Sequence, residues 1–149
     1  MNNRMKKIQR IILVVHDIDK AMKFYTTLLG GTFYETDSKA YGVRCAINFG
    51  AGMELLSPLP GCDSESKRWL DTRGECLMGV VYEPEDIEQA RSNAEKELGL
   101  KPLTTMDSSE EQLVHLFPGK VPPFKKYMQS FYNPSELNNV KLLFGEYHE

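Results

Sequence analysis

The stretch KIQRIILVVHDIDKAMKFYTTLLG, residues 7–30, decides the fold of this 149-residue chain. Residues 8–15 are mainly β-branched and aliphatic, which favours a strand. Strand side chains alternate between two faces, so Ile11, Leu13 and Val15 share one face, and the other carries Ile8, Arg10, Ile12 and Val14. Both faces are largely apolar, so we expect a central strand covered on both sides, with Arg10 as its polar exception.

The same stretch continues into an amphipathic helix over residues 18–29. Asp17 is a good N-cap, because its carboxylate accepts hydrogen bonds from the free N–H groups of the first turn. Apolar residues at steps of three and four predict one apolar stripe, formed by Ile18, Ala21, Met22, Tyr25, Leu28 and Leu29. The glycines that follow, Gly30 and Gly31, favour a left-handed helix end.

Residues 77–99, LMGVVYEPEDIEQARSNAEKELG, repeat this pattern. An Asp-Ile-x-x-Ala sequence with a glycine nine residues after the alanine begins at Asp17 and again at Asp86. Both copies follow a pair of valines, at residues 14–15 and 80–81. A spacing shared by two capped strand–helix units is typical of an internal repeat.

Short strands complete both halves. We expect them at residues 32–35, 41–49 and 53–57, and again at residues 101–106, 127–132 and 140–144. The pattern predicts an α+β fold of two βαβββ modules in one structural domain, with the first module at residues 1–60, a linker at 61–74 that holds a short helical piece, and the second module at 75–149. An insertion at about residues 107–126 has no counterpart in the first half, and loops of this length are commonly functional or disordered.

Composition excludes several classes of protein. The 18 basic and 21 acidic residues give a net charge of −3, which argues against a nucleic-acid binder. No apolar run approaches the length of a membrane span, and the N-terminus does not read as a signal peptide. The three cysteines have no metal-type spacing and are interpreted as free thiols, incidental to function. We therefore expect a cytoplasmic protein without nucleic-acid or membrane partners.

The chain resembles the vicinal oxygen chelate superfamily, the group of glyoxalase I, methylmalonyl-CoA epimerase, extradiol dioxygenases and bleomycin-resistance proteins. The resemblance is carried by VVHDIDKAMKFYTTLLGG (residues 14–31), GMELLSPL (52–59) and FYNPSELNNVKLLF (131–144). It implies that the curved mixed sheets of the two modules form a cup with the helices outside. It also implies a homodimer.

Metal-dependent members of this superfamily carry four ligands on the floor of the cup: a His, a Glu, a second His and a second Glu. The matching positions of this chain hold Arg10, Glu54, Gly79 and Leu143. Arg10 cannot ligate a metal, because a guanidinium has no lone pair to offer. One carboxylate does not hold a catalytic ion, so we expect no metal and no other cofactor.

The three histidines are the alternative source of ligands. His16 is expected to be exposed at the helix entry, and His148 lies in the tail. His115, in the insertion, remains a candidate ligand.

The resemblance places Arg10 and Glu54 on neighbouring strands. We expect them to form an ion pair in place of the metal, because a semi-buried charge needs a partner. Gly79 and Leu143 are expected to leave the opposite side of the site open and apolar. With Ile12, these residues would line a site for a small organic molecule that is anionic or carries a carbonyl group.

Two functions fit such a site. One is a binding protein. The other is a metal-independent isomerase or lyase, in which Glu54 removes a proton next to a carbonyl and Arg10 stabilises the resulting enolate, with Tyr127, Tyr132 or His115 as candidate acid. The alternative is the family default, a metal-dependent lyase, epimerase or dioxygenase. A purely structural ion pair would predict no ligand.

Overall fold

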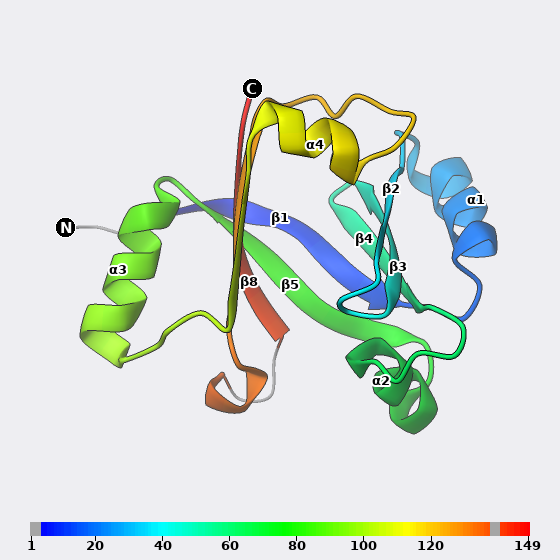
Figure 1. Cartoon of the computed structure of the whole chain (residues 1–149), viewed down its shortest axis with the longest axis horizontal. Coiled ribbons are helices and arrows are strands. Elements are labelled where there is room, and N and C mark those ends of the chain that lie inside the picture. The colour runs from blue at the N-terminus through cyan, green and yellow to red at the C-terminus, as the bar shows by residue number, and fades with distance from the viewer. Residues whose placement is uncertain (1–3, 138–140) are drawn as a thin grey trace. The chain divides into compact units, whose positions relative to one another are not determined.

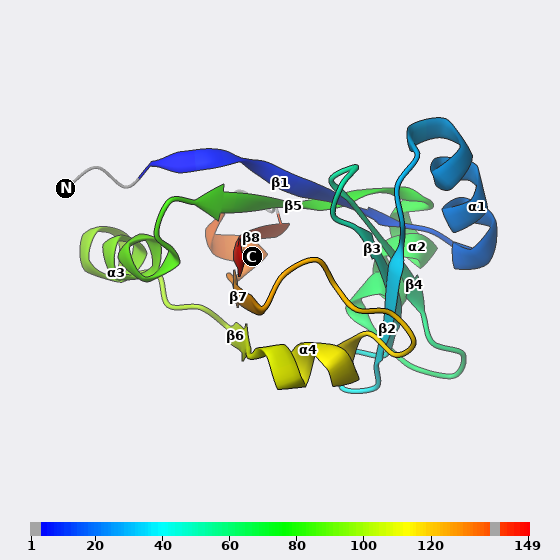
Figure 2. The same cartoon turned by 90° about the horizontal axis from the view of Figure 1, so that it is seen from above.

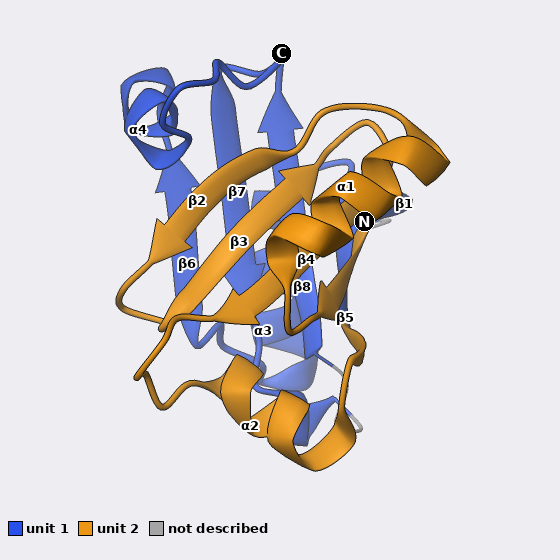
Figure 3. Cartoon of the chain, turned by 90° about the vertical axis from the view of Figure 1, so that its right-hand side faces the viewer, with its two compact units in different colours: residues 1–9, 79–149 blue, residues 10–78 orange. Residues whose placement is uncertain are grey.

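The computed structural model of the chain describes residues 4–137 and 141–149. It divides into two compact units, coloured separately in Figure 3. The N-terminal unit is residues 10–78, and the C-terminal unit is residues 79–149 together with residues 1–9. Both boundaries fall inside strands, namely β1 (Met5–Val14) and β5 (Cys76–Pro84). In the described ranges, no helix is long and apolar enough to cross a membrane.

The N-terminal unit is a mixed four-stranded sheet with two helices (Figure 1). After β1 come α1 (Ile18–Leu29), β2 (Tyr34–Ser38), β3 (Val43–Asn48), β4 (Met53–Pro58) and α2 (Glu65–Arg73). The pairing of β1 with β4 is parallel, whereas β2 with β3 and β3 with β4 are antiparallel. This is the βαβββ order that the sequence predicts, and α2 occupies most of the expected linker.

Helix α1 begins and ends as the sequence predicts. Asp17 Oδ1 accepts from the backbone N–H of Lys20 at 3.0 Å, and Gly30 ends the helix with a φ of 72°. The inward side packs on one face of the sheet through a cluster formed by Val15, Ile18, Phe33, Ala46, Met53 and Leu55. The predicted stripe is wrong at its end, because Leu28 and Leu29 are 63% and 49% exposed. Packing against the cluster stops at Tyr25.

The C-terminal unit repeats this arrangement. Its elements are β5, α3 (Ile87–Leu98), β6 (Thr104–Ser108), α4 (Glu110–Leu116), β7 (Lys126–Phe131), a 3₁₀ turn (Pro134–Glu136) and β8 (Lys141–His148). Strands β5 and β8 are parallel, and β6–β7 and β7–β8 are antiparallel. Helix α3 is 12 residues long, as α1 is, with Asp86 as its N-cap and Gly99 at its end. The α+β class and the repeated order are confirmed.

Several strand boundaries differ from the prediction. The strands expected at 32–35 and 101–106 begin later, at Tyr34 and Thr104. After α1, two glycines with positive φ turn the chain before it can pair, and after α3 Pro102 lacks an N–H for pairing. The last strand extends to His148, and residue 140, its predicted start, lies outside the described residues.

The insertion is partly helical. Figure 2 shows α4 following directly on β6. Ser109 and Gln112 form a reciprocal capping box that begins this helix. Leu113 and Phe117 are buried at 1% and 3% exposure, and α4 contacts β6 and β7 of the same unit.

Candidate active site

Arg10 and Glu54 form the ion pair that the sequence predicts. Arg10 Nε donates to Glu54 Oε2 at 2.6 Å, and the two side chains are 2% and 11% exposed. The register explains the pairing. Strand β1 runs parallel to β4 with Ile12 opposite Glu54, so Arg10 lies two residues before Glu54's partner on the same face. That face is turned away from α1, which covers the side of Ile11 and Leu13.

Cys45 also contacts the carboxylate. Its Sγ lies 3.3 Å from Glu54 Oε1, so each oxygen of Glu54 has a donor. The antiparallel register of β3 and β4 places Ile47 opposite Glu54 and therefore Cys45 on the same face, two residues away. The guanidinium of Arg10 also lies 5.9 Å from the ring centre of Phe49, which packs against Tyr34 at 5.8 Å between ring centres. The pair is thus held between a thiol and an aromatic cluster.

The residues at the four metal positions do not fit a metal. Arg10 carries a positive charge and is bound to the one carboxylate of the set. Within residues 4–137 and 141–149, no three His, Cys, Asp or Glu side chains are grouped closely enough to hold an ion. Leu143, at the second Glu position, is a buried apolar residue at 4% exposure.

The backbone around Gly79 leaves no room for a metal-ligating side chain at residue 79. Gly79 stands opposite Lys141 in the parallel pairing of β5 and β8. A Cβ at residue 79 would lie 2.5 Å from the Lys141 carbonyl oxygen and 2.9 Å from Lys141 Cβ. Lys141 therefore occupies the space directly beside Gly79. A histidine at this position would force the two strands apart.

The histidines and Tyr127, the other candidate ligands and acids, differ in their exposure and hydrogen bonds. His16 and His115 are exposed, and His148 Nε2 lies 3.2 Å from Glu146 Oε1 at the end of the chain. Tyr127 OH donates to Gln129 Oε1 at 2.9 Å, on the face of the C-terminal sheet that carries Leu143.

Tyr132 lies on the opposite face of that sheet, edge to face with Phe144. Burial, partly offset by Arg91, raises the pKa of Tyr132 above its ordinary value of 10.0. Tyr132 therefore lies on the α3 side of this sheet, and not on the side of Leu143.

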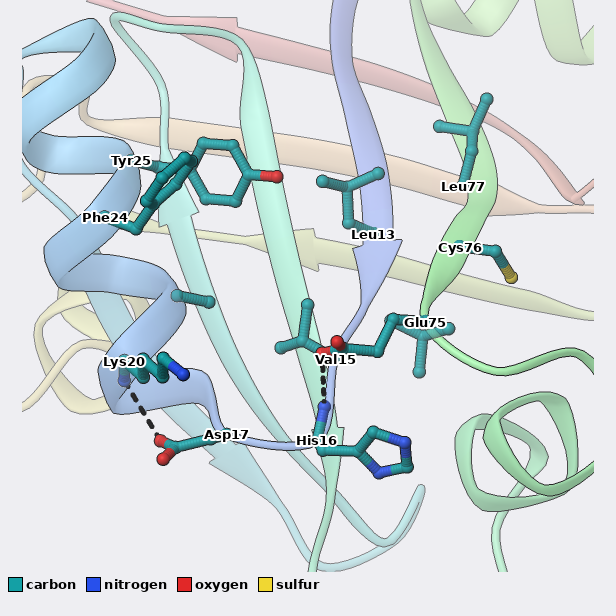
Figure 4. A pocket seen from close by; sticks show the side chains of 12 residues that line it. Leu13, Val15, His16, Asp17, Lys20, Phe24, Tyr25, Glu75, Cys76 and Leu77 are labelled. Atoms are coloured by element: carbon teal, nitrogen blue, oxygen red, sulfur yellow. Dashed lines mark hydrogen bonds between the residues drawn. The ribbon is translucent and has the colours of Figure 1, made fainter.

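A separate hollow of about 530 Å³ lies on the α1 side of the N-terminal unit (Figure 4). Its walls come from α1, the end of β1 and the start of β5, and include Leu13, Phe24, Tyr25 and Leu77. His16 donates its backbone N–H to Glu75 Oε2 at 3.0 Å at one end of the hollow. None of the predicted site residues lines it. The candidate site and this hollow are on opposite faces of the sheet.

Comparison with solved structures shows which known fold this chain has. No protein-family model and no curated protein matches the sequence. The fold is that of solved methylmalonyl-CoA epimerases, which are vicinal oxygen chelate proteins.

The enzyme from Mycobacterium tuberculosis matches with a TM-score of 0.72 and 17% identity over 98% of this chain and 91% of that one. The Streptomyces coelicolor epimerase, in complex with 2-nitronate-propionyl-CoA, matches with a TM-score of 0.65 and 18% identity over 95% and 97% of the chains. A hypothetical protein from Bacillus halodurans matches with a TM-score of 0.67 and 21% identity over 100% and 97% of the chains. At these identities the likeness shows the fold alone.

Sequence reasoning missed Cys45 and Phe49. The signal was present in the strand pattern. Every second residue of a strand points to the same side, and on one side the sequence places Tyr41, Val43, Cys45, Ile47 and Phe49. The short Gly-Ala-Gly turn at residues 50–52 then fixes the hairpin register, with Asn48 opposite Met53. Counting back from that turn places Cys45 on the face of Glu54.

Proposed function

We propose that this protein binds a small organic molecule with a carboxylate or carbonyl oxygen beside Arg10 and Glu54. It then acts as a metal-independent isomerase or lyase, or holds the molecule as a binding protein. The observation that carries the proposal is the 2.6 Å ion pair between Arg10 and Glu54, the residues that the resemblance aligns with two metal ligands. A fixed cation next to a carboxylate provides both a partner for an anionic oxygen and a base.

The surroundings of the pair favour this chemistry. Arg10 keeps its charge at every working pH, and a guanidinium has several donors in a planar fork that suits carboxylates. The low exposure of both side chains, 2% and 11%, means that little water weakens their electrostatic interactions. Ile12, at 1% exposure, and Ile47, at 6%, supply apolar contact on the same face. Apolar walls with few polar groups are typical of small-molecule sites.

The fold suggests which ligands to test first. Solved epimerases of this fold are complexed with methylmalonyl-CoA and with 2-nitronate-propionyl-CoA. Methylmalonyl-CoA carries a carboxylate and a thioester carbonyl on either side of one acidic carbon. That chemistry matches the class proposed for Arg10 and Glu54. A suitable panel therefore combines such acyl-CoA esters, 2-oxo acids and dicarboxylic acids with matched uncharged amides.

Binding is tested by thermal shift and calorimetry with this panel. We expect acids to raise the melting temperature and the matched amides to have a smaller effect. The double variant Arg10→Met with Glu54→Leu removes both charges together and should abolish the shift. The control variant Arg44→Met removes a surface arginine of the same unit, 32% exposed, and should keep it. If no compound of the panel binds or changes the melting temperature, a purely structural role of the ion pair is favoured.

Enzyme and binding protein are then separated by Glu54→Gln. An enzyme loses turnover but keeps binding, whereas a binding protein has no turnover to lose. The alternative, a metal-dependent lyase, epimerase or dioxygenase, predicts a stoichiometric divalent ion in the purified protein, removable with a chelator. Elemental analysis of that protein decides between the readings.

We also propose a homodimer in the cytoplasm. Exposed apolar side chains support it, since Phe24, Leu28 and Leu77 of the N-terminal unit are 59%, 63% and 54% exposed. Light scattering after size exclusion should give twice the mass of the 17.0 kDa chain. A monomer at all concentrations would overturn this part of the proposal.

A further inference from the structure

Cys45 is the third member of the cluster around Glu54. Its Sγ lies 3.3 Å from Glu54 Oε1, while Arg10 Nε lies 2.6 Å from Glu54 Oε2. Cys45 is 8% exposed, whereas Cys62 and Cys76 are half-buried. The charge of Glu54 already has a partner in Arg10. The thiol is therefore a second donor to the carboxylate, at its other oxygen.

We infer that Cys45 and Glu54 act together as a proton-transfer couple that moves a proton between neighbouring atoms on one face of the substrate. This rests on the proposed function, because it requires the ligand to lie beside Arg10 and Glu54. It also narrows that function. The protein is an isomerase or tautomerase of carboxylate-bearing carbonyl compounds, such as 2-oxo acids, and does not invert a stereocentre.

Geometry carries the distinction between these reactions. Inversion at a carbon needs an acid and a base on opposite faces, so the two groups stand about 6 Å apart, twice the reach of a proton transfer. The Cys45 and Glu54 atoms are 3.3 Å apart and come from adjacent strands on the same face of the sheet. Both therefore reach a bound molecule from the same side. A proton removed by one is replaced from that side by the other.

The proposed step is balanced within the protein and substrate. In ketonisation of an enol, the Glu54 carboxylate accepts the enol hydroxyl proton, and Arg10 stabilises the negative charge that develops on that oxygen. The C=O bond forms as the electron pair of the C=C bond takes the proton of the Cys45 thiol and makes a new C–H bond. The neutral Glu54 then returns its proton to the thiolate across the 3.3 Å contact. No metal, oxidant or other co-reactant is needed.

Phenylpyruvate is the probe, because it combines a carboxylate, a carbonyl and a carbon that exchanges hydrogen. We expect the protein to accelerate ketonisation of its enol and, in D₂O, to place deuterium on one face of the carbon next to the carbonyl. Cys45→Ala should lower the rate about 100-fold, the usual effect of removing a general acid. Cys45→Ser keeps a donor of similar size and should lie between. Cys62→Ala and Cys76→Ala are the matched controls and should behave as the parent protein.

The outcomes separate this inference from the proposed function. If phenylpyruvate binds but the protein does not accelerate ketonisation, or if Cys45→Ala reacts at the parent rate, the role of Cys45 is refuted and binding stands. Deuterium on both faces, or interconversion of the methylmalonyl-CoA epimers, would also refute it. If no member of the ligand panel binds, the proposed function itself fails. Melting temperatures of Cys45→Ala and Cys45→Ser confirm that the variants are folded.

Discussion

Arg10 Nε and Glu54 Oε2 lie 2.6 Å apart on the face of the N-terminal sheet that α1 does not cover. The two residues are 44 positions apart in sequence and meet because β1 and β4 pair in parallel. Both side chains are withdrawn from water, at 2% and 11% exposure. Two buried charges of opposite sign stabilise each other, but each destabilises the folded state when the other is removed.

The first prediction follows from that dependence. Arg10→Met and Glu54→Leu, made singly, should each lower the free energy of unfolding by about 3–5 kcal/mol, because each leaves a buried charge without its partner. The double variant should be much closer to the parent protein, since a buried ion pair replaced by apolar side chains is often nearly neutral. Urea unfolding of the four proteins gives the double-mutant cycle. Additive losses would contradict a direct interaction.

Arg44 provides the control for this cycle. It contacts Asp19 and Glu35 at 3.1 and 3.2 Å, and these acids are 71% and 50% exposed. Water and salt weaken such surface pairs, which contribute about 0–1 kcal/mol. Arg44→Met should therefore cost far less than Arg10→Met, and its cost should fall further in high salt.

The second prediction concerns the close approach of β5 and β8 at Gly79. In Gly79→Ala the new Cβ would lie 2.5 Å from the Lys141 carbonyl oxygen, and two backbone strands must move to relieve the contact. We expect a loss of about 1–3 kcal/mol in the free energy of unfolding, as overpacking of a core typically costs. Gly50→Ala is the control, because its nearest neighbour lies 3.7 Å away, an ordinary contact. Equal stability of the two variants would show that the strands separate without cost.

The sequence predicted the frame of each unit well because local signals fix it. Asp17 and Asp86 are N-caps whose side chains bond the first turn, and Gly30 and Gly99 end both helices after 12 residues. These effects act over a few residues, so one sequence reveals them. The Arg10–Glu54 pair was also predictable, because the resemblance fixed which strands are neighbours.

Other features depend on tertiary register, which local patterns do not encode. The space beside Gly79 is filled by Lys141, 62 residues later, and nothing near Gly79 in the sequence indicates it. The contact of Cys45 with Glu54 required the register of a hairpin. Leu28 and Leu29 continue the apolar period of α1, but the packed cluster ends before them.

The third prediction concerns Tyr132, which is 2% exposed and has no hydrogen-bond partner for its hydroxyl in residues 4–137 and 141–149. Tyr132→Phe removes a buried polar group that gains nothing from the fold. At pH 7 we expect the free energy of unfolding to stay level or rise by up to about 1 kcal/mol. Tyr41→Phe, at an exposed tyrosine, is the control and should have no effect.

The same variant has a pH dependence with a definite sign. Burial raises the pKa of Tyr132 above 10.0, so the folded state holds this proton more tightly than the unfolded chain does. The stabilisation is complete below pH 10 and is lost as the pH rises towards the pKa of the folded state. Between pH 9 and about 11, the parent protein should therefore lose more stability than Tyr132→Phe. Parallel pH profiles for the two proteins would contradict burial of the hydroxyl.

The fourth prediction concerns Arg91, which ties α3 to the C-terminal sheet. Its Nη2 donates to Asp107 Oδ1 at 2.8 Å and to the Gln129 carbonyl oxygen at 3.1 Å, and its Nε donates to Ser130 Oγ. The side chain is 12% exposed. A lysine keeps the charge but offers a single point of contact, and cannot reach these three strand groups in one geometry. Arg91→Lys should therefore cost about 1–2 kcal/mol in the free energy of unfolding.

Hydrogen exchange locates the effect. If Arg91 anchors α3, the amides of that helix should exchange faster in Arg91→Lys, while those of α1 keep their protection. Arg68→Lys in α2 is the matched control, because Arg68 is 61% exposed and contacts one exposed acid, Asp63. Arg68→Lys should keep the free energy of unfolding within about 0.5 kcal/mol of the parent protein and leave the amide exchange rates unchanged. If Arg91→Lys has an effect as small as that of Arg68→Lys, then the positive charge alone, and not the forked geometry of the guanidinium, holds α3 in place.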